Sequence, residues 1–275
     1  MTTTASPRQT RRRISAGAIW RGLAGVAGLF VLLEIVSRSG LISTTYLPPF
    51  SEVVWRALQL WIDPDFLSNV GQTLLTYLLG LLISAVIAIP LGIVFGLLNP
   101  VYRATRAVVE LIRPIPPVAL IPLVLLALGN GLEMKLVIVV FAAVWPIMFN
   151  TLYGVHDVDP YQKDMGRSFG LGRFGIIRRI VIPAAAPFIM TGVRIASSIA
   201  LIVVITVELI SPGGAKGIGA YIAAQQLSYQ DSAVTYLSVL AATITAGVLG
   251  LVINLVIGWV ERRFFGWDST ARDGV

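Results

Sequence analysis

The sequence contains no cysteine, and its one histidine is His156. Without thiols the chain has no disulfide framework, no thiolate metal site and no cysteine nucleophile. One imidazole does not make a multi-histidine metal site, and a serine–histidine–aspartate triad is not arguable around it. The dipeptide Gly-Lys, which the phosphate-binding loop of many ATPases requires, is also missing. We therefore expect no enzyme activity, no cofactor and no ATP binding through such a loop.

Charged residues are scarce as well. They make up 13% of the chain, whereas hydrophobic residues make up 56% and the mean hydropathy is +0.83. A soluble domain carries roughly a quarter charged residues, so this composition predicts an all-α polytopic membrane protein. The sequence holds about six apolar runs, each long enough to cross roughly 30 Å of hydrocarbon as a helix. These runs are residues 19–37, 73–98, 104–128, 134–153, 188–210 and 234–260.

The ends of the chain differ from its apolar middle. The Thr- and Arg-rich start predicts a disordered basic tail, and no small-residue cleavage pattern precedes Arg38, so the first run is interpreted as an anchor. A turn at Leu47-Pro48-Pro49-Phe50 precedes an amphipathic helix that begins near Ser51 and is expected on the outer surface. The expected organisation is a tail at 1–18, a first span with an outer helix at 19–69, a transmembrane domain at 70–263 with a cytoplasmic loop at 159–187, and a C-terminal tail at 264–275.

The distribution of Lys and Arg orients the spans. With the N-terminus inside, only Arg38, Arg56, Lys135 and Lys216 of the 21 basic residues fall outside. The pI of about 10.0 is therefore a positive-inside signature, and no nucleic-acid partner is needed to explain it. Both termini are expected in the cytoplasm.

A polar stretch over residues 159–187 interrupts the second half of the chain. Asp159 suits an N-cap, Pro160 suits the first helical position, and Gly170 is placed to end that short helix in the left-handed region. A second short helix with arginines on one face is expected before Pro183 and the next span. The pattern predicts a helix–glycine–helix device, with a solvated basic connector as the alternative.

Two further features interrupt the apolar runs. The prolines that follow Arg113 must break or bend the run at 104–128, and such breaks are tolerated where the backbone faces protein or a water-filled path. Glu208 lies deep in its run, where an acid usually marks a pathway, a relay or a pairing partner. Snorkelling of Arg113 to the interface and hydration of Glu208 at the outer rim are the alternatives. The candidate pathway residues are Arg113, Pro114, Pro116, Pro117 and Glu208. Gly92 and Gly96 form a G-x-x-x-G face for close helix packing.

The spacing within 159–187 resembles the EAA loop of permease subunits of bacterial ABC importers. The family pattern is E-A-A, three residues, G, nine residues, I, one residue, L-P. This sequence has Gly170, Ile180, Ile182 and Pro183 at the matching positions. The first three positions depart, because Asp164-Met165-Gly166 shortens the acid by a methylene and puts a weak helix former in the first helix.

Three other blocks extend the resemblance over nearly the whole chain after residue 40. Leu47-Pro48-Pro49-Phe50-Ser51-Glu52-Val53 looks like the Leu-Pro-x-Pro-Ser-x-Val segment of nitrate/sulfonate/taurine-type permeases. The segment from Arg113 to Leu123 resembles their broken span, and Glu261-Arg262-Arg263 followed by Trp267 resembles their C-terminal segment.

The resemblance implies a type I ABC importer (MetI-like) transmembrane fold in the bacterial cytoplasmic (inner) membrane. It also implies a second permease copy, usually identical, two ABC ATPase subunits on the cytoplasmic side and an extracytoplasmic solute-binding protein. The solute would be a small anion such as a sulfonate, taurine, nitrate or an aromatic acid. The coupling helix would be residues 160–169. The residues expected to couple to the ATPase are Tyr161, Asp164, Met165, Gly166, Ser168, Phe169, Gly170 and Pro183.

Two other functions compete with this one. An ion-coupled secondary transporter would use Glu208, but only six spans are expected, no inverted repeat is evident and the cytoplasmic device would have no use. A membrane scaffold or receptor subunit without transport is the other alternative, and the proline-broken span argues against it.

Overall fold

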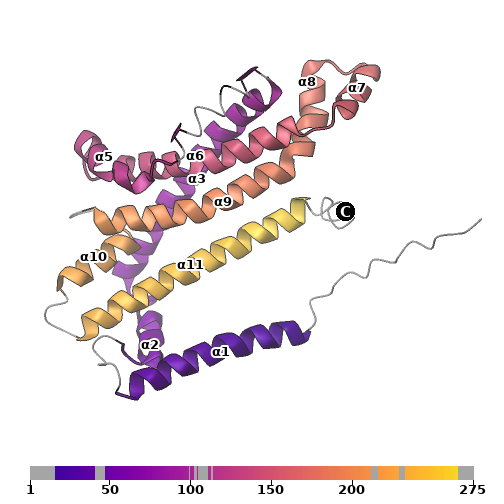
Figure 1. Ribbon diagram of the computed structural model, residues 1–275. Helices are drawn as coiled ribbons and strands as arrows, with labels where there is room; N and C mark the ends of the chain where they lie inside the picture. The colour runs from indigo at the N-terminus through magenta and orange to yellow at the C-terminus, as the bar shows by residue number, and fades with distance from the viewer. Residues whose placement is uncertain are drawn as a thin grey trace, which may run out of the picture. The chain divides into compact units, whose positions relative to one another are not determined.

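The computed structural model describes residues 16–40, 47–98, 114–211, 216–228 and 233–265, together with residues 100, 101, 104, 111 and 112. The regular structure over these ranges is helical, which agrees with the expected fold class (Figure 1). The chain divides into two units, Met1–Arg56 and Ala57–Val275, and each is described by itself.

The first unit holds helix α1 (Ala16–Arg38) and the start of helix α2 (Phe50–Leu60). Helix α1 contains the expected span at 19–37. It begins three residues before that span, so its first turn includes the last three residues of the expected tail, where alanines favour a helix. The Glu34 carboxylate joins the two helices, since it accepts hydrogen bonds from the backbone N–H and the hydroxyl of Ser51 at 3.0 and 2.9 Å. The rings of Phe30 and Phe50 stack beside it, with centroids 4.2 Å apart.

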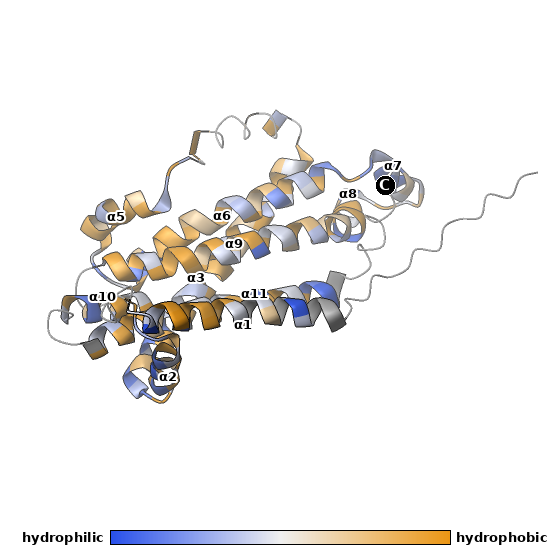
Figure 2. Ribbon diagram, turned by 60° about the horizontal axis from the view of Figure 1, so that its bottom comes forward, coloured by the Kyte–Doolittle hydropathy of each residue, from blue (hydrophilic) through white to orange (hydrophobic). Residues whose placement is uncertain are grey.

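Four helical segments in the described part of the second unit are long and apolar enough to cross a membrane. They are α3 (Pro64–Leu97), α6 (Leu132–His156), the continuous helix Arg173–Ile210 and α11 (Ala233–Phe265). Figure 2 shows hydrophobic residues along α6 and α9 and hydrophilic ones in α7. With α1, these segments correspond to five of the six expected spans.

The sixth expected span, at 104–128, is broken where the prolines predicted a break. Pro114 and Ile115 form a turn in which the Ile115 N–H donates to the Ile112 carbonyl at 3.0 Å. A 3₁₀ turn, η1 (Pro117–Leu120), then leads into the short helix α5 (Ile121–Leu128). Arg113 itself lies outside the described residues.

Helices α3 and α6 approach closely because α3 presents glycines to α6. A Cβ added at Gly92 would lie 2.6 Å from Cβ of Thr151, and one at Gly96 would lie 2.8 Å from the Leu152 carbonyl oxygen. These two positions confirm the G-x-x-x-G packing face. On the other side of α6, Gly192 brings α9 (Ile182–Ile210) against it in the same way, with Asn150 Cβ 2.8 Å from where a side chain would begin.

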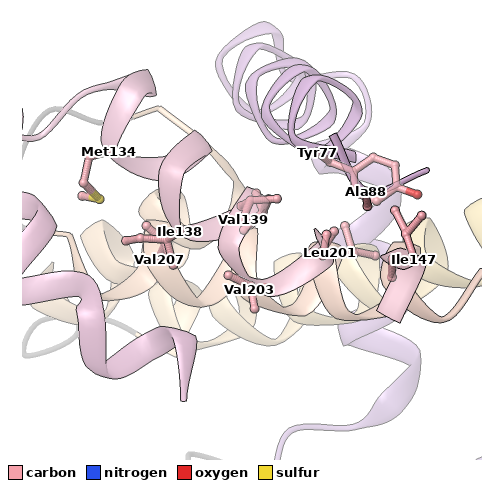
Figure 3. Close-up of a cluster of buried hydrophobic side chains, with 14 of the residues drawn as sticks. Tyr77, Ala88, Met134, Ile138, Val139, Ile147, Leu201, Val203 and Val207 are labelled. Carbon is pink, nitrogen blue, oxygen red and sulfur yellow. The ribbon is translucent and has the colours of Figure 1, made fainter. Parts of the chain in front are cut away.

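The hydrophobic core lies where α3, α6 and α9 pack together (Figure 3). Tyr77 of α3, Ile138 and Ile147 of α6, and Val203 and Val207 of α9 are buried there. One polar contact crosses this core, a 2.6 Å hydrogen bond between the hydroxyls of Tyr77 and Ser197. Small residues and a satisfied hydroxyl pair are the devices by which helices associate inside a membrane.

The structure corrects the expectation that a separate short helix precedes the fifth span. Helix α8 (Arg173–Ile176) begins as expected, but it continues through a π turn, η2 (Ile177–Val181), directly into α9. The Ile182 N–H donates to the Ile177 carbonyl, five residues back. This wider turn stands just before Pro183, which lacks the N–H of a regular α-helical bond, so the chain passes the proline without ending the helix.

Candidate functional site

The start of helix α7 (Pro160–Ser168) is fixed by its N-cap. The Asp159 carboxylate accepts a hydrogen bond from the Tyr161 N–H at 2.8 Å, and Pro160 occupies the first helical position. A side-chain cap of this kind contributes about 1 kcal/mol, and the predicted N-terminus of the helix is confirmed.

The end of α7 is a Schellman motif centred on Gly170. Gly170 has φ of 78°, in the left-handed region, and its N–H donates to the Arg167 carbonyl at 2.9 Å. The Leu171 N–H donates to the Gly166 carbonyl at 3.0 Å. These are the two hydrogen bonds that define the motif, so the glycine expected to end this helix does end it.

Gly166 is the residue by which α7 packs onto the following helix. It is buried, and a Cβ there would lie 2.5 Å from Cδ1 of Ile180 in η2. The sequence predicted only a loss of helix propensity at this position. The structure shows that the missing side chain lets α7 lie against the segment that continues into α9.

The outer surface of α7 carries large apolar side chains on an otherwise polar segment. Tyr161, Met165 and Phe169 are 70%, 45% and 81% exposed, and their spacing of four residues puts them on neighbouring turns. Exposed apolar groups gathered in this way mark an interaction site. Asp164, Ser168 and Pro183 are exposed too, so seven of the eight predicted coupling residues are at the surface and Gly166 is buried.

Asp164 has a partner within its own helix. Its carboxylate accepts from the Arg167 guanidinium at 2.6 Å, in an exposed i,i+3 pair. Exposed pairs of this kind contribute little to stability, so both groups stay available to another protein. The structure therefore brings an acid, a base and an apolar surface together at the tip of the cytoplasmic loop expected from the sequence.

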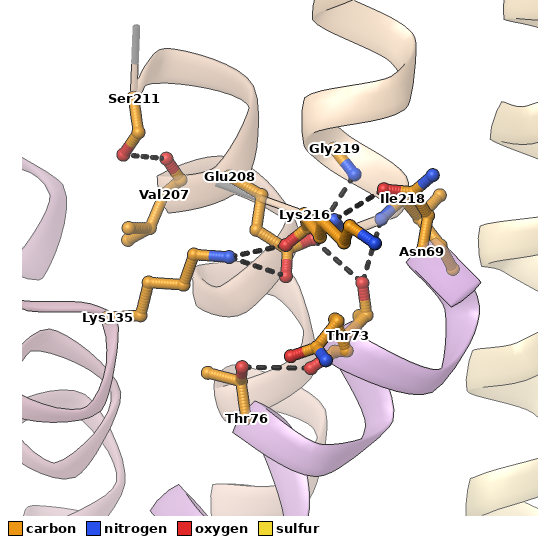
Figure 4. A network of polar contacts seen from close by, with 12 residues as sticks. Asn69, Thr73, Thr76, Lys135, Val207, Glu208, Ser211, Lys216, Ile218 and Gly219 are labelled. Carbon is orange, nitrogen blue, oxygen red and sulfur yellow. Dashed lines mark hydrogen bonds and ion pairs between the residues drawn. The ribbon is translucent and has the colours of Figure 1, made fainter. Parts of the chain in front are cut away.

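A second polar cluster lies at the opposite end of α9, around Glu208 (Figure 4). The side chain is 0% exposed, so Glu208 is not hydrated at a rim. Its carboxylate pairs with the Lys135 ammonium at 3.3 Å and accepts from the Thr73 hydroxyl at 2.8 Å and the Gly219 N–H at 3.2 Å. Three partners from separate helices satisfy an acid that would otherwise be costly at this depth.

The same cluster holds the segment that precedes helix α10 (Ile218–Ser228). Lys135 donates to the Lys216 carbonyl at 2.7 Å, and the Thr73 hydroxyl accepts from the Ile218 N–H at 2.8 Å. Gly217 has φ of 152°, and any side chain there would collide with the Glu208 carboxylate. The backbone of residues 216–219 therefore packs directly against this ion pair.

Sequence reasoning found Glu208 but none of its partners. Lys135 lies 73 residues away and was counted only as a basic residue outside the membrane. The signal that could have joined them is an acid and a base at the same end of two apolar runs. The described residues show no polar contact between Glu208 and Pro114, Pro116 or Pro117, the other predicted pathway residues.

The long apolar helices, with the capped helix α7 between two of them, define the class of protein as a polytopic membrane subunit. Residues 88–266 match the family described as binding-protein-dependent transport system inner membrane component, which is more than half of the chain. The chain belongs to this family. It is a multi-pass inner-membrane permease subunit, not a catalytic one, and it functions with an ATPase and a binding protein. This assignment replaces the two alternatives raised by the sequence.

Curated relatives are similar over most of their length. The bicarbonate transport system permease protein of Synechococcus elongatus is 29% identical over 251 residues, 87% of each chain. The nitrate import permease protein of Leptolyngbya laminosa is 27% identical over 274 residues, 94% of this chain and 95% of the relative. The taurine transport system permease protein of Escherichia coli K12 is 27% identical over 255 residues, 89% of each.

Two solved structures share the fold. A bacterial ABC transporter involved in import of the acidic polysaccharide alginate aligns with a TM-score of 0.59 and 20% identity, covering 92% of this chain and 94% of that one. The MetNI methionine ABC transporter in inward-facing conformations aligns with a TM-score of 0.50 and 19% identity, covering 78% and 96%. The predicted MetI-like transmembrane fold is confirmed.

Proposed function

We propose that this permease forms the translocation pathway for a small anion, which a binding protein delivers from outside and two ATPase subunits drive from the cytoplasm. The named solutes of three relatives, bicarbonate, nitrate and taurine, support a small solute that carries an anionic group. The sequence resemblance to nitrate/sulfonate/taurine-type permeases favours the same class.

The observation that carries the proposal is the way α7 is attached to the bundle. The helix is capped at both ends, seated on Ile180 through Gly166, and presents Tyr161, Met165 and Phe169 outward. The segment on which it sits runs without a break into α9. A partner protein that binds α7 and moves it would therefore also move α9. Coupling of ATP hydrolysis to transport requires such a connection.

The proposed docking of an ATPase on α7 also predicts the orientation of the chain in the membrane and the number of permease copies. An ATPase docking on α7 places this end in the cytoplasm, in agreement with the positive-inside distribution, and both termini with it. The Glu208 cluster then lies toward the outside, about 40 Å away along the 29 residues of α9. One chain supplies one α7, so two ATPase subunits need two copies, and we propose a homodimer.

Two segments are proposed to change during transport. The broken span with Pro114, Pro116 and Pro117, next to Arg113, leaves backbone that only protein or water can satisfy inside a membrane. The ion pair of Glu208 and Lys135 holds residues 216–219 across the outer end of the bundle. Together they are suited to line and close a pathway on its outer side.

The test is reconstitution of this chain with its ATPase and its binding protein. Uptake of labelled bicarbonate, nitrate and taurine into vesicles is expected for at least one anion, and only with ATP and the binding protein present. The purified chain alone is expected to hydrolyse no ATP, because it lacks the phosphate-binding loop. Uptake restricted to cations or uncharged solutes, or uptake without the ATPase, would contradict the proposal.

A further inference from the structure

A groove of about 460 Å³ lies between α9 and α11. Its walls are aliphatic along most of their length, but Ser197, Ser198 and Asn254 add polar groups. On the α11 side, Gly247 and Gly250 line the groove with backbone atoms and no side chain. A groove with a few convergent polar groups among apolar ones is the usual form of a small-molecule site.

Arg194 stands at one end of this groove. Its Nε donates to Oδ1 of Asn254 at 3.3 Å, and its Nη1 donates to the Glu261 carboxylate at 3.1 Å. Ser198 lies one turn further along the same face of α9. Arg194 is thus a charged group in direct contact with the polar part of the groove wall.

The position of Arg194 is not that of an ordinary surface charge. It lies six residues, or about 9 Å, inside the span expected at 188–210, within the continuous apolar helix Arg173–Ile210. Basic groups at such depth are costly and mostly face a pathway or a water-filled cavity. Glu261 compensates the charge from α11, one residue beyond the expected end of its span.

The ion pair is only partly covered by the rest of the chain. The side chains of Arg194 and Glu261 are 46% and 31% exposed, so the pair is not a buried tie between helices. A guanidinium has five N–H donors, and the two bonds to Asn254 and Glu261 use two of them within the part of the chain that the structure describes. Donors remain for a further acceptor, and a planar guanidinium binds oxoanions better than an ammonium does.

We propose that Arg194, Ser198 and Asn254 form an anion-attracting site in the α9–α11 groove, at the cytoplasmic end of the translocation pathway. The ligand is a small oxoanion, in the size range of nitrate, bicarbonate or a short sulfonate. Glu261 takes the place of the anion while the site is empty and holds the guanidinium toward the groove. The statement that this site lies on a transport pathway rests on the proposed function, whereas its preference for anions is tested separately.

The natural absence of cysteine makes the test direct. Ser198→Cys introduces one thiol at an exposed position whose hydroxyl makes only a 3.5 Å bond to its own helix. The full chain in lipid nanodiscs is treated with anionic 2-sulfonatoethyl methanethiosulfonate or with its cationic trimethylammonium counterpart. The rate of thiol modification by each reagent is divided by the rate of its reaction with free 2-mercaptoethanol, which corrects for the different reactivity of the two reagents. The corrected rate for the anionic reagent is then divided by that for the cationic reagent, and this ratio is compared between variants.

The expected ratio for Ser198→Cys is above one. Adding Arg194→Gln is expected to lower it at least about fivefold, and adding Glu261→Gln is expected to raise it by a similar factor, because each removes one unit charge near the thiol. Arg263→Gln is the matched control, since it removes a positive charge from an exposed position on α11 away from the groove, and the ratio is expected to stay unchanged. Failure of both reagents to react, or a ratio unaffected by Arg194→Gln, would overturn the site.

A second measurement addresses the pathway. In the reconstituted importer, Arg194→Gln is expected to lower uptake of the transported anion at least tenfold, and Arg194→Lys, which keeps the charge but loses the fork, is expected to retain part of it. ATP hydrolysis should continue in both variants, since Arg194 does not lie in α7. Uptake equal to that of the unaltered importer in Arg194→Gln would overturn the role in transport. Absence of uptake in the unaltered importer, together with the expected rate ratios, would instead refute the proposed function and leave the anion site standing.

Discussion

Single glycines at three positions determine how this chain folds around its two polar clusters. Gly166 leaves room for Ile180, Gly170 supplies the left-handed residue that ends α7, and Gly217 leaves room for the Glu208 carboxylate. The first of these departs from the alanine of the EAA pattern. The space that a Cβ would need at Gly166 is filled by the flexible end of Ile180.

Gly170→Val is expected to disconnect the ATPase. A β-branched residue in the left-handed region costs about 1 kcal/mol or more, and the Schellman motif would rearrange. The variant should insert in the membrane normally but retain less ATPase on purification, with uptake reduced at least tenfold. Gly175→Ala is the control, because its Cβ would lie 3.5 Å from Leu171, an ordinary contact. Equal ATPase retention in Gly170→Val and the unaltered chain would mean that the loop is a solvated connector.

Asp164→Lys tests the charge on the same surface. The substitution replaces the bond to Arg167 by a like-charge i,i+3 pair, which destabilises the helix by only roughly 0.5 kcal/mol. A large loss of ATPase retention would therefore come from repulsion at the partner. Asp164→Asn, which removes the charge and keeps the shape, should have an intermediate effect. Retention of the ATPase by Asp164→Lys at the level of the unaltered chain would show that the carboxylate does not take part in docking.

Elements were predictable from the sequence where local signals define them. Asp159, Pro160 and Gly170 act on neighbouring backbone groups, so the sequence alone predicts the bounds of α7. The partner of Glu208 could not be derived, because Lys135 belongs to another helix and only packing brings the two together. The π turn before Pro183 was missed for a related reason: a proline predicts a break, while the continuous helix depends on the bundle holding both halves in line.

At the scale of elements, the ion pair of Glu208 and Lys135 joins α3, α6, α9 and the start of α10. Glu208→Gln alone is expected to leave Lys135 buried without a counter-charge, at a cost of about 3–5 kcal/mol. The double variant Glu208→Gln with Lys135→Met should recover most of that loss, because no uncompensated charge remains. Thermal unfolding in nanodiscs of the unaltered chain, Glu208→Gln, Lys135→Met and the double variant measures this. Additive destabilisation in the double variant would show that the two groups do not act as a pair.

At the scale of the whole subunit, one helix connects the two clusters. The continuous segment Arg173–Ile210 carries the seat of α7 at its first turns and Glu208 near its last. Its 38 residues span about 57 Å as a helix, which is long enough to cross the membrane and project beyond it. With α7 on the proposed cytoplasmic side, we expect a displacement of α7 to reach residues 216–219 through this one helix, with the proposed Arg194 site between the two.

This arrangement predicts that damage at the two ends has different consequences. Gly170→Val acts where the ATPase is proposed to dock, so it should lower ATPase retention and with it all ATP hydrolysis by the complex. Lys135→Met acts about 40 Å away, so the ATPase should remain bound at the level of the unaltered chain. Because residues 216–219 would lose the hydrogen bond from Lys135, we expect that variant to hydrolyse ATP at the same rate with and without the binding protein and to import little solute. Retention, basal hydrolysis and binding-protein stimulation measured on both variants separate the two ends. Loss of the ATPase from Lys135→Met in a preparation that remains folded would show that the clusters are not the two separate ends of one transmitting helix.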